Sequence, residues 1–165
     1  MQTHGETHIR QALFADVKAI YGLIRSNSDM LITRSISDIV ANTDRFLIAE
    51  SGGEAIGAIA YEFLPEIGDP ARTSVELQSV CVKPEWRGRG IGKMLVEAQI
   101  SRLLPLAPYQ IVVLTFAVGF FEKLGFRVVP KTTLMHKLYM GCINCTKHES
   151  PFTCPEQAMV KIVGS

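Results

Sequence analysis

One segment of the sequence joins a strand, a glycine-rich loop and the start of a helix, and it is the segment best suited to chemistry. The apolar residues Val80–Val82 predict the end of a strand, and Arg87-x-x-Gly90-x-Gly92 leads from there into a helical pattern. The first N–H groups of a helix have no partner within it, and glycines allow the backbone to close on a pyrophosphate. Arg87 and Arg89 can add charge-assisted hydrogen bonds. The segment therefore predicts an anion-binding loop.

The glycines alone would also fit a mobile turn, so their context decides the interpretation. The segment lacks the Lys-Ser/Thr ending of a nucleotide P-loop, and it lacks a dinucleotide fingerprint with its later acid. Together with Phe121-Glu122-Lys123-Leu124-Gly125-Phe126, which follows at the usual separation, the loop resembles the cofactor motif of the GNAT acetyltransferases, over roughly Ile9 to Val129. The resemblance implies acetyl-CoA as cosubstrate. It also implies an α/β fold with a mixed, mostly antiparallel, twisted sheet, splayed at the cofactor strand and with helices on both faces.

The resemblance assigns roles to individual residues of the loop and its strand. The main chain of Val80–Val82 would pair with the pantetheine arm and supply an N–H to the thioester oxygen as that oxygen gains negative charge. Backbone N–H groups from Arg87 to Gly92 would hold the pyrophosphate. The cofactor-binding positions that it implies are Val80, Cys81, Val82, Arg87, Gly88, Arg89, Gly90, Ile91, Gly92 and Phe121.

Acetylation of an amine also requires proton transfer, because an amine with a pKa of about 8 or higher is mostly protonated at neutral pH. Glu76 matches a position where many GNAT enzymes carry a glutamate that acts as a base or orders a water. It could equally be a solvated carboxylate or an ion-pair partner. In this family a tyrosine often protonates the departing CoA thiolate, and the matching position here is Phe121. The thiolate would then leave directly or be protonated by water or another residue. Tyr109 and Tyr139 are possible substitutes, although packing roles fit both better.

A finer resemblance concerns the acceptor amine and extends along nearly the whole chain. It is to the short, stand-alone bacterial N-acetylglutamate synthases, which begin arginine biosynthesis. The segments that carry it are Leu31–Ser35, Phe46–Glu50, Val75–Leu77, Leu114-Thr115 with Phe120-Phe121, Cys142–Cys145 and Glu156–Met159. It implies transfer of acetyl to the α-amine of L-glutamate, or of glutamine, by direct attack in a ternary complex.

An acceptor with carboxylates requires cationic donors, and a planar guanidinium suits a carboxylate well. Arg34 is the leading candidate, and Lys137 beside His136 is a second, although either could be an ordinary surface residue. Four positions depart from the pattern expected of the synthases: Phe116, Ala117, Met135 and Gly141. Another acceptor, such as a polyamine, an aminoglycoside or a protein N-terminus, therefore stays open. A non-catalytic acetyl-CoA-binding module is the alternative from a different class.

Three of the four cysteines lie close together near the end of the chain. Cys142-x-x-Cys145-x-x-His148, followed by Cys154, offers three thiols and an imidazole, which is an acceptable tetrahedral zinc set. The short loop and its two prolines fit such a site poorly, and plain reduced cysteines or a redox-labile pair are alternatives. We therefore assign no metal to the chain.

Apolar periodicity predicts the elements that position these residues. Helices are expected at Asp16–Arg25, Ser37–Ala41, Gly90–Leu103 and Val118–Leu124. Strands are expected at Ile9–Leu13, Phe46–Glu50, Ala55–Phe63, Ser74–Lys83 and Ile111–Thr115, with a last strand pair within Phe126–Tyr139. At 165 residues we expect a single GNAT domain over residues 1–165, with residues 141–165 forming a cysteine-containing tail.

Composition excludes several classes of partner. Seventeen basic against sixteen acidic residues leave a net charge of +1, which disfavours nucleic acid as a partner. Met1–Arg10 is too polar for a secretory signal, and the longest apolar run, Ile111–Phe121, is too short to span a membrane. We expect a cytoplasmic enzyme with a small amine substrate and no membrane partner. A homodimer is possible because GNAT enzymes are often dimers.

Overall fold

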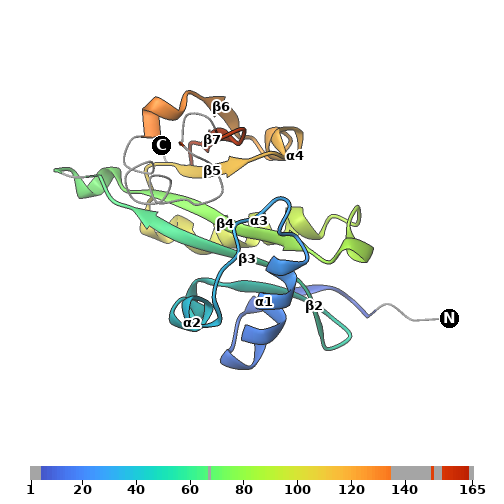
Figure 1. Ribbon diagram of the computed structural model, residues 1–165. Coiled ribbons are helices and arrows are strands. Elements are labelled where there is room, and N and C mark those ends of the chain that lie inside the picture. The colour runs from blue at the N-terminus through green and yellow to red at the C-terminus, as the bar shows by residue number, and fades with distance from the viewer. Residues whose placement is uncertain (1–4, 67, 135–149, 151–153, 164–165) are drawn as a thin grey trace. The chain divides into compact units, whose positions relative to one another are not determined.

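The computed structural model describes residues 5–66, 68–134, 150 and 154–163. The strands are β1 (His8–Gln11), β2 (Leu47–Ser51), β3 (Glu54–Leu64), β4 (Ser74–Val82), β5 (Ile111–Thr115), β6 (Arg127–Val129) and β7 (Gln157–Lys161). The helices are α1 (Val17–Arg25), α2 (Ile36–Ala41), α3 (Ile91–Leu103) and α4 (Val118–Glu122), with short 3-10 helices between the elements. Figure 1 shows these elements along the chain.

The strands are hydrogen-bonded in the order β1-β2-β3-β4-β5-β7-β6. The pairs β1–β2, β2–β3, β5–β7 and β6–β7 are antiparallel, whereas β4–β5 is parallel. The parallel pair requires a crossover connection, and α3 lies in it. The predicted mixed, mostly antiparallel sheet is confirmed. The chain forms two compact units. The first unit consists of Met1–Tyr61 and Leu77–Arg102, and the second consists of Glu62–Glu76 and Leu103–Ser165. Strands β3 and β4 therefore each contribute to both units.

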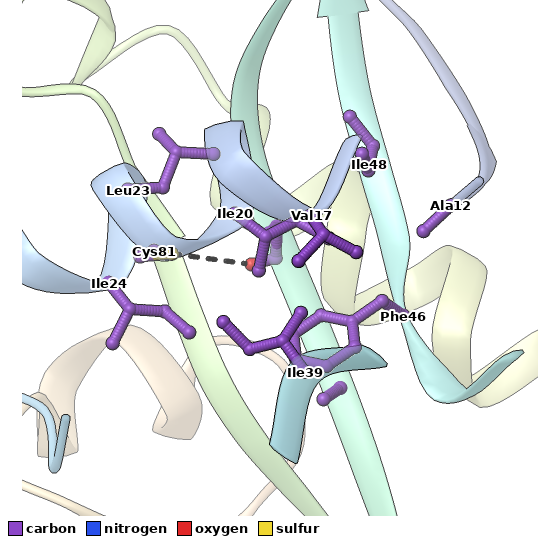
Figure 2. Close-up of a cluster of buried hydrophobic side chains, with 11 residues drawn as sticks. Ala12, Val17, Ile20, Leu23, Ile24, Ile39, Phe46, Ile48 and Cys81 are labelled. Carbon is purple, nitrogen blue, oxygen red and sulfur yellow. Dashed lines mark hydrogen bonds between the residues drawn. The ribbon is translucent and has the colours of Figure 1, made fainter. Parts of the chain in front are cut away.

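In the first unit, α1 and α2 cover one face of β2 and β3. Apolar residues of α1 recur at helical spacing, and those that are buried are Val17, Ile20, Leu23 and Ile24. The side chain of Ser35 caps α2 by accepting the N–H of Asp38 at 3.1 Å. These helices pack with Phe46, Ile48 and Cys81 into one apolar cluster (Figure 2). Burial of each large side chain of this cluster contributes about 1.5–3 kcal/mol.

The opposite face of β3 carries α3. Ala58 and Ala60 belong to the cluster beneath α1, so the intervening positions of the strand point the other way. At Gly57, an added Cβ would lie 3.0 Å from the Leu95 side chain and 3.4 Å from the Ile91 side chain, both on α3. Glycine at this position therefore allows α3 to lie close to the strand, and the expected helices on both faces are present in this unit.

A charged network fastens β1 to its neighbours in the same unit. The guanidinium of Arg10 on β1 donates to both Asp16 oxygens, at 2.8 and 2.9 Å, and to Glu50 on β2 at 2.7 and 2.9 Å. The Leu13 N–H also donates to Asp16. These hydrogen bonds hold the pKa of Asp16 below its ordinary value of 3.8. The segment between β1 and α1 is therefore fixed by a carboxylate that must stay ionised.

In the second unit, β5 lies between β4 and β7. The β4–β5 ladder consists of Val75↔Ile111 and Glu76↔Val112, while β5 pairs with β7 along its whole length. The buried side chains of the unit's apolar cluster come from β3, β5, the 3-10 helix before residue 135 and β7: Leu64, Val112, Leu134, Ala158 and Val160. β7 lies in the segment that we expected to be a tail, where the sequence analysis predicted no strand.

The last predicted strand pair, within Phe126–Tyr139, needs correction. β6 occupies Arg127–Val129, but its antiparallel partner is β7. Residues Lys131–Leu134 form a 3-10 helix instead of a strand. Pro130 supplies the physical reason, because it has no N–H for a ladder, and its carbonyl accepts both the N–H and the hydroxyl of Thr133. Residues 135–139 lie outside the described residues.

Across the described residues, no helix has both the length and the apolar character that a membrane crossing demands. A single domain over residues 1–165 stays a prediction.

We expect Asp16→Asn to lower the free energy of unfolding at pH 7 by about 1–2 kcal/mol, because a charge-assisted pair becomes a neutral one. The pKa of Asp16 is lowered by folding, so its stabilisation is complete above its unfolded value and is lost as the pH falls through the folded value. Urea unfolding at several pH values should show the deficit shrinking below about pH 4. Asp29→Asn, at an exposed position, is the control; an equal deficit at all pH values would contradict the role of the charge.

Candidate functional site

β4 contains a kink immediately before the residues predicted to hold the cofactor arm. Ser79 has φ of +53°, in the left-handed region that residues other than glycine rarely adopt. Such a residue within a strand interrupts the regular alternation and redirects the chain after it. Val80, Cys81 and Val82 follow directly, so the kink sets the course of the strand that leads to the loop.

After the kink, the backbone groups of β4 alternate between the two edges of the strand. The Lys83 N–H donates to the Ile56 carbonyl of β3 at 2.8 Å. Backbone groups two residues apart face the same edge, so those of Cys81 also face β3, and those of Val80 and Val82 face the other edge. The prediction for Val80–Val82 is thereby sharpened. Main-chain pairing with a ligand arm is expected at Val80 and Val82.

The Cys81 side chain is buried in the cluster beneath α1 and donates weakly to the Ala58 carbonyl at 3.9 Å, as Figure 2 shows. Burial raises the pKa of the Cys81 thiol to about 12. The thiol is therefore protonated at neutral pH and cannot act as a nucleophile. Cys81 can contribute packing, but it cannot carry a covalent acyl intermediate.

The loop after β4 has the geometry of an anion cradle. Pro84–Trp86 form a 3-10 turn, Gly88 and Gly90 have φ of +77° and +81°, and α3 begins at Ile91. The Gly90 carbonyl accepts the first helical bond, from Met94 at 3.1 Å, so the N–H groups that follow it have no partner within the helix. A Cβ added at Gly88 or Gly90 would meet no atom within 4 Å. The backbone thus borders open space that a pyrophosphate would fill.

The two arginines of the loop have protein partners of their own. Arg87 donates to the side-chain oxygen of Asn27 at 2.5 Å. Arg89 lies over the Trp86 ring, 4.7 Å from its centroid, and donates to the Glu85 carbonyl at 3.3 Å. These contacts help to fix the shape of the loop, and an anion site at its backbone N–H groups stays a prediction.

Arg34, the leading acceptor candidate, lies beside the kink of β4. Its Nη1 is 3.4 Å from the Ser79 hydroxyl, and its guanidinium covers the Phe46 ring at 5.1 Å. Nε donates to Asp38 at 2.5 Å, one turn further along the chain. Only 16% of the Arg34 side chain is exposed. Arg34 is therefore not a freely exposed arginine, and its role toward the acceptor stays a prediction.

Two further predicted residues belong to the second unit. Glu76 on β4 is paired in register with Val112 and is only 4% exposed, so the alternative of a solvated strand-end carboxylate does not hold. Phe121 on α4 is buried and makes edge-to-face contacts with Phe120 and Phe126, at 4.9 and 5.2 Å between ring centroids. A hydrocarbon ring at this position cannot transfer a proton.

Several predicted residues lie outside the described residues: Lys137, Tyr139, Cys142, Cys145 and His148. Among the residues described, Cys154 has a free, partly buried thiol. Its backbone carbonyl accepts a hydrogen bond from the Lys131 ammonium at 2.5 Å. Tyr109 is exposed, and its hydroxyl accepts from Arg72 at 3.1 Å. The zinc set and the acceptor role of Lys137 stay predictions.

Comparisons with known proteins now decide the family. The family model described as an acetyltransferase (GNAT) domain matches residues 42–128. An uncharacterized N-acetyltransferase of Chlorobaculum tepidum is 30% identical over 158 residues, which cover 94% of this chain and 96% of that one. The chain belongs to the GNAT acetyltransferase family.

Other relatives of this GNAT chain have more specific names. An amino-acid acetyltransferase of Mycobacterium tuberculosis is 26% identical over 136 residues, covering 79% of this chain and 74% of that protein. The crystal structure of N-acetylglutamate synthase from Neisseria gonorrhoeae, complexed with coenzyme A and N-acetyl-glutamate, has a TM-score of 0.77. It is 20% identical, and the match covers 98% of this chain and 36% of that one, so it supports the GNAT fold alone.

Sequence reasoning missed two residues that contact the predicted site residues of this GNAT chain. Ser79 shows no signal in the sequence, because serine is not a residue type that marks a positive φ. Asn27 follows the last turn of α1, where asparagine commonly ends helices, and its spacing from the loop gave no hint of contact. Both became visible only in three dimensions.

We expect Gly90→Ala to weaken binding of coenzyme A at least tenfold, because a Cβ at positive φ strains the cradle and fills the space in front of it. Calorimetric titration with coenzyme A measures this loss. Gly53→Ala is the matched control, since Gly53 also has positive φ, at +79°, and open space around it, but lies in the β2–β3 turn. Both variants should lose about 1 kcal/mol of stability. Equal coenzyme A affinity in the two variants would contradict the cradle.

Proposed function

We propose that this GNAT acetyltransferase transfers the acetyl group of acetyl-CoA to the α-amine of L-glutamate or L-glutamine. The observation that carries the proposal is the position of Arg34, whose guanidinium is held beside the kink of the cofactor strand. The curated relatives named as amino-acid acetyltransferases support it from the sequence. The similar N-acetylglutamate synthase structure, complexed with coenzyme A, supports acetyl-CoA as the cosubstrate.

Arg34 has the chemistry to hold a substrate carboxylate. A guanidinium carries five N–H donors in a plane, and the hydrogen bonds to Asp38 and Ser79 use two of them. Asp38 fixes the plane through Nε, so the Nη1 and Nη2 side can meet a carboxylate through two parallel hydrogen bonds. Asp38 is 44% exposed and balances part of the positive charge of Arg34.

The chemistry of Cys81 supports transfer by direct attack. The buried, protonated thiol of Cys81, beside the cofactor strand, cannot accept an acetyl group. In the proposed reaction the acceptor amine attacks the thioester carbon itself, and the C–S bond to coenzyme A breaks. An N–H on the outer edge of β4, at Val80 or Val82, would donate to the carbonyl oxygen as it gains negative charge. The amine must first lose a proton, and Glu76, through a water, is the proposed base. With Phe121 in the acid's place, the departing thiolate leaves unprotonated or takes its proton from water.

The same proposal includes a setting for the reaction. It places the enzyme in the cytoplasm at the first step of arginine biosynthesis, as a single GNAT domain and with a homodimer as a possible assembly. A small amine substrate is expected, with neither nucleic acid nor membrane as partner.

The acceptor is tested by release of the CoA thiol from acetyl-CoA in the presence of single amino acids, polyamines, an aminoglycoside and short peptides. Glutamate or glutamine should give the highest kcat/KM. Arg34→Lys should raise KM for that acceptor at least tenfold, because lysine keeps the charge and loses the planar fork, while coenzyme A affinity stays unchanged. Arg25→Lys, at an exposed arginine on α1, is the control. Release with another amine and none with glutamate or glutamine would overturn the assignment; no release with any amine would indicate a binding module.

Glu76 is tested by its effect on the pH dependence of turnover. Glu76→Gln should lower kcat/KM about 10²-fold near neutral pH, because a general base is removed while the shape of the side chain is kept. The deficit should shrink as the pH approaches the pKa of the acceptor amine, which then needs no base. Glu97→Gln, at an exposed position on α3, controls for loss of charge. An unchanged rate and pH profile would remove Glu76 from the proton path.

A further inference from the structure

Asn27 joins three parts of the first unit through one buried amide. It lies two residues beyond the end of α1 and is only 6% exposed. Its Nδ2 donates to the Leu23 carbonyl of α1 at 2.8 Å and lies 3.5 Å from the Val82 carbonyl at the end of β4. Its Oδ1 accepts from the guanidinium of Arg87 in the loop. The helix, the cofactor strand and the cofactor loop therefore meet at this side chain.

The placement of Asn27 has consequences for both groups that it holds. A buried amide whose partners are all supplied by the protein keeps one orientation, because any rotation leaves a donor or an acceptor unsatisfied. The Arg87 side chain is thereby anchored, and with it the backbone that leads into Gly88 and Gly90. The Val82 carbonyl is also engaged, which leaves the Val82 N–H as that residue's group for a ligand on the outer edge of β4.

The main chain of Asn27 begins the segment that leads to Arg34, the proposed acceptor residue. Its carbonyl accepts the N–H groups of Met30 and Leu31, at 3.0 and 2.9 Å, and so begins the turn that leads to Arg34. Asn27 thus fixes the turn before Arg34 with its backbone and the cofactor loop with its side chain.

We propose that Asn27 is a positioning residue for acetyl-CoA, acting through Arg87 on the backbone of the cofactor loop. The proposal rests on the proposed function, since it requires that this loop binds the cosubstrate. Asn27 touches neither the reacting atoms nor the acceptor in this account. Its contribution is to hold the loop in the conformation that presents the N–H groups after Gly88 and Gly90 to the pyrophosphate.

A double-mutant cycle on coenzyme A affinity tests the proposal, with Asn27→Ala, Arg87→Met and the double variant compared by calorimetry. Each single variant should weaken coenzyme A binding about tenfold, as expected for loss of a hydrogen bond to a charged group. The double variant should bind no more weakly than the worse single variant, because both substitutions remove the same contact. In Asn27→Ala the KM for acetyl-CoA should change by a larger factor than kcat does.

Asn42→Ala is the matched control for a merely structural role. Asn42 also follows a helix and donates from Nδ2 to the carbonyl four residues earlier at 2.8 Å, in this case that of Asp38. Both alanine variants should lower the melting temperature, but only Asn27→Ala should change the affinity for coenzyme A. Asn27→Asp keeps an acceptor for Arg87, so it should recover most of that affinity although it loses the bond to Leu23.

The outcomes separate this proposal from the proposed function. If the wild-type protein binds no coenzyme A, the proposed function fails, and this inference fails with it. If the wild type binds and the two substitutions have additive effects, or Asn27→Ala binds as the wild type does, only the positioning role is overturned. Equal losses of coenzyme A affinity in Asn27→Ala and Asn42→Ala would likewise overturn it, because a general loss of stability would then explain both.

Discussion

The alternation of backbone groups along β4 is the constraint on which the candidate site depends. One edge of the strand is used by β3, as the Lys83–Ile56 hydrogen bond shows. The other edge is used by β5 at Val75 and Glu76. The left-handed residue Ser79 then redirects the strand, and beyond it the backbone of Val80 and Val82 faces away from β3. In this account the pairing with β3 holds one edge of β4, and the change of direction at Ser79 leaves the other edge for a ligand.

The side chains around β4 serve this arrangement in different ways. Cys81 packs inward and is chemically silent, which keeps the course of the strand fixed without offering a competing nucleophile. Asn27 and Arg87 hold its end and the loop beyond it. Arg34, the proposed acceptor residue, reaches the kink at Ser79 and is oriented by Asp38. The cosubstrate and the acceptor would thus be positioned against the same few residues of one strand.

Much of the fold was predictable, because its information is local. β5 was predicted at its observed bounds from a short apolar run, and α1 and α3 within one residue from helical spacing and the neighbouring glycine. The cofactor loop was predictable because positive φ and a helix start demand glycine at fixed spacing. The last strand was missed because Gln157–Lys161 is a strand by virtue of its pairing with β5 and β6. Both partners lie far from it in the sequence. The burial of Glu76, the contact of Arg34 with Ser79 and the partner of Arg87 are likewise long-range facts that no local pattern encodes.

The central claim is that backbone N–H groups of β4 and its loop hold acetyl-CoA. Amide hydrogen exchange followed by NMR, with and without coenzyme A, tests it most directly. The account predicts slower exchange on binding at the amides of Val80 and Val82 and of residues 88–92. The amide of Lys83, already paired with Ile56, should change little. Tight binding of coenzyme A without slower exchange at these amides would contradict the account.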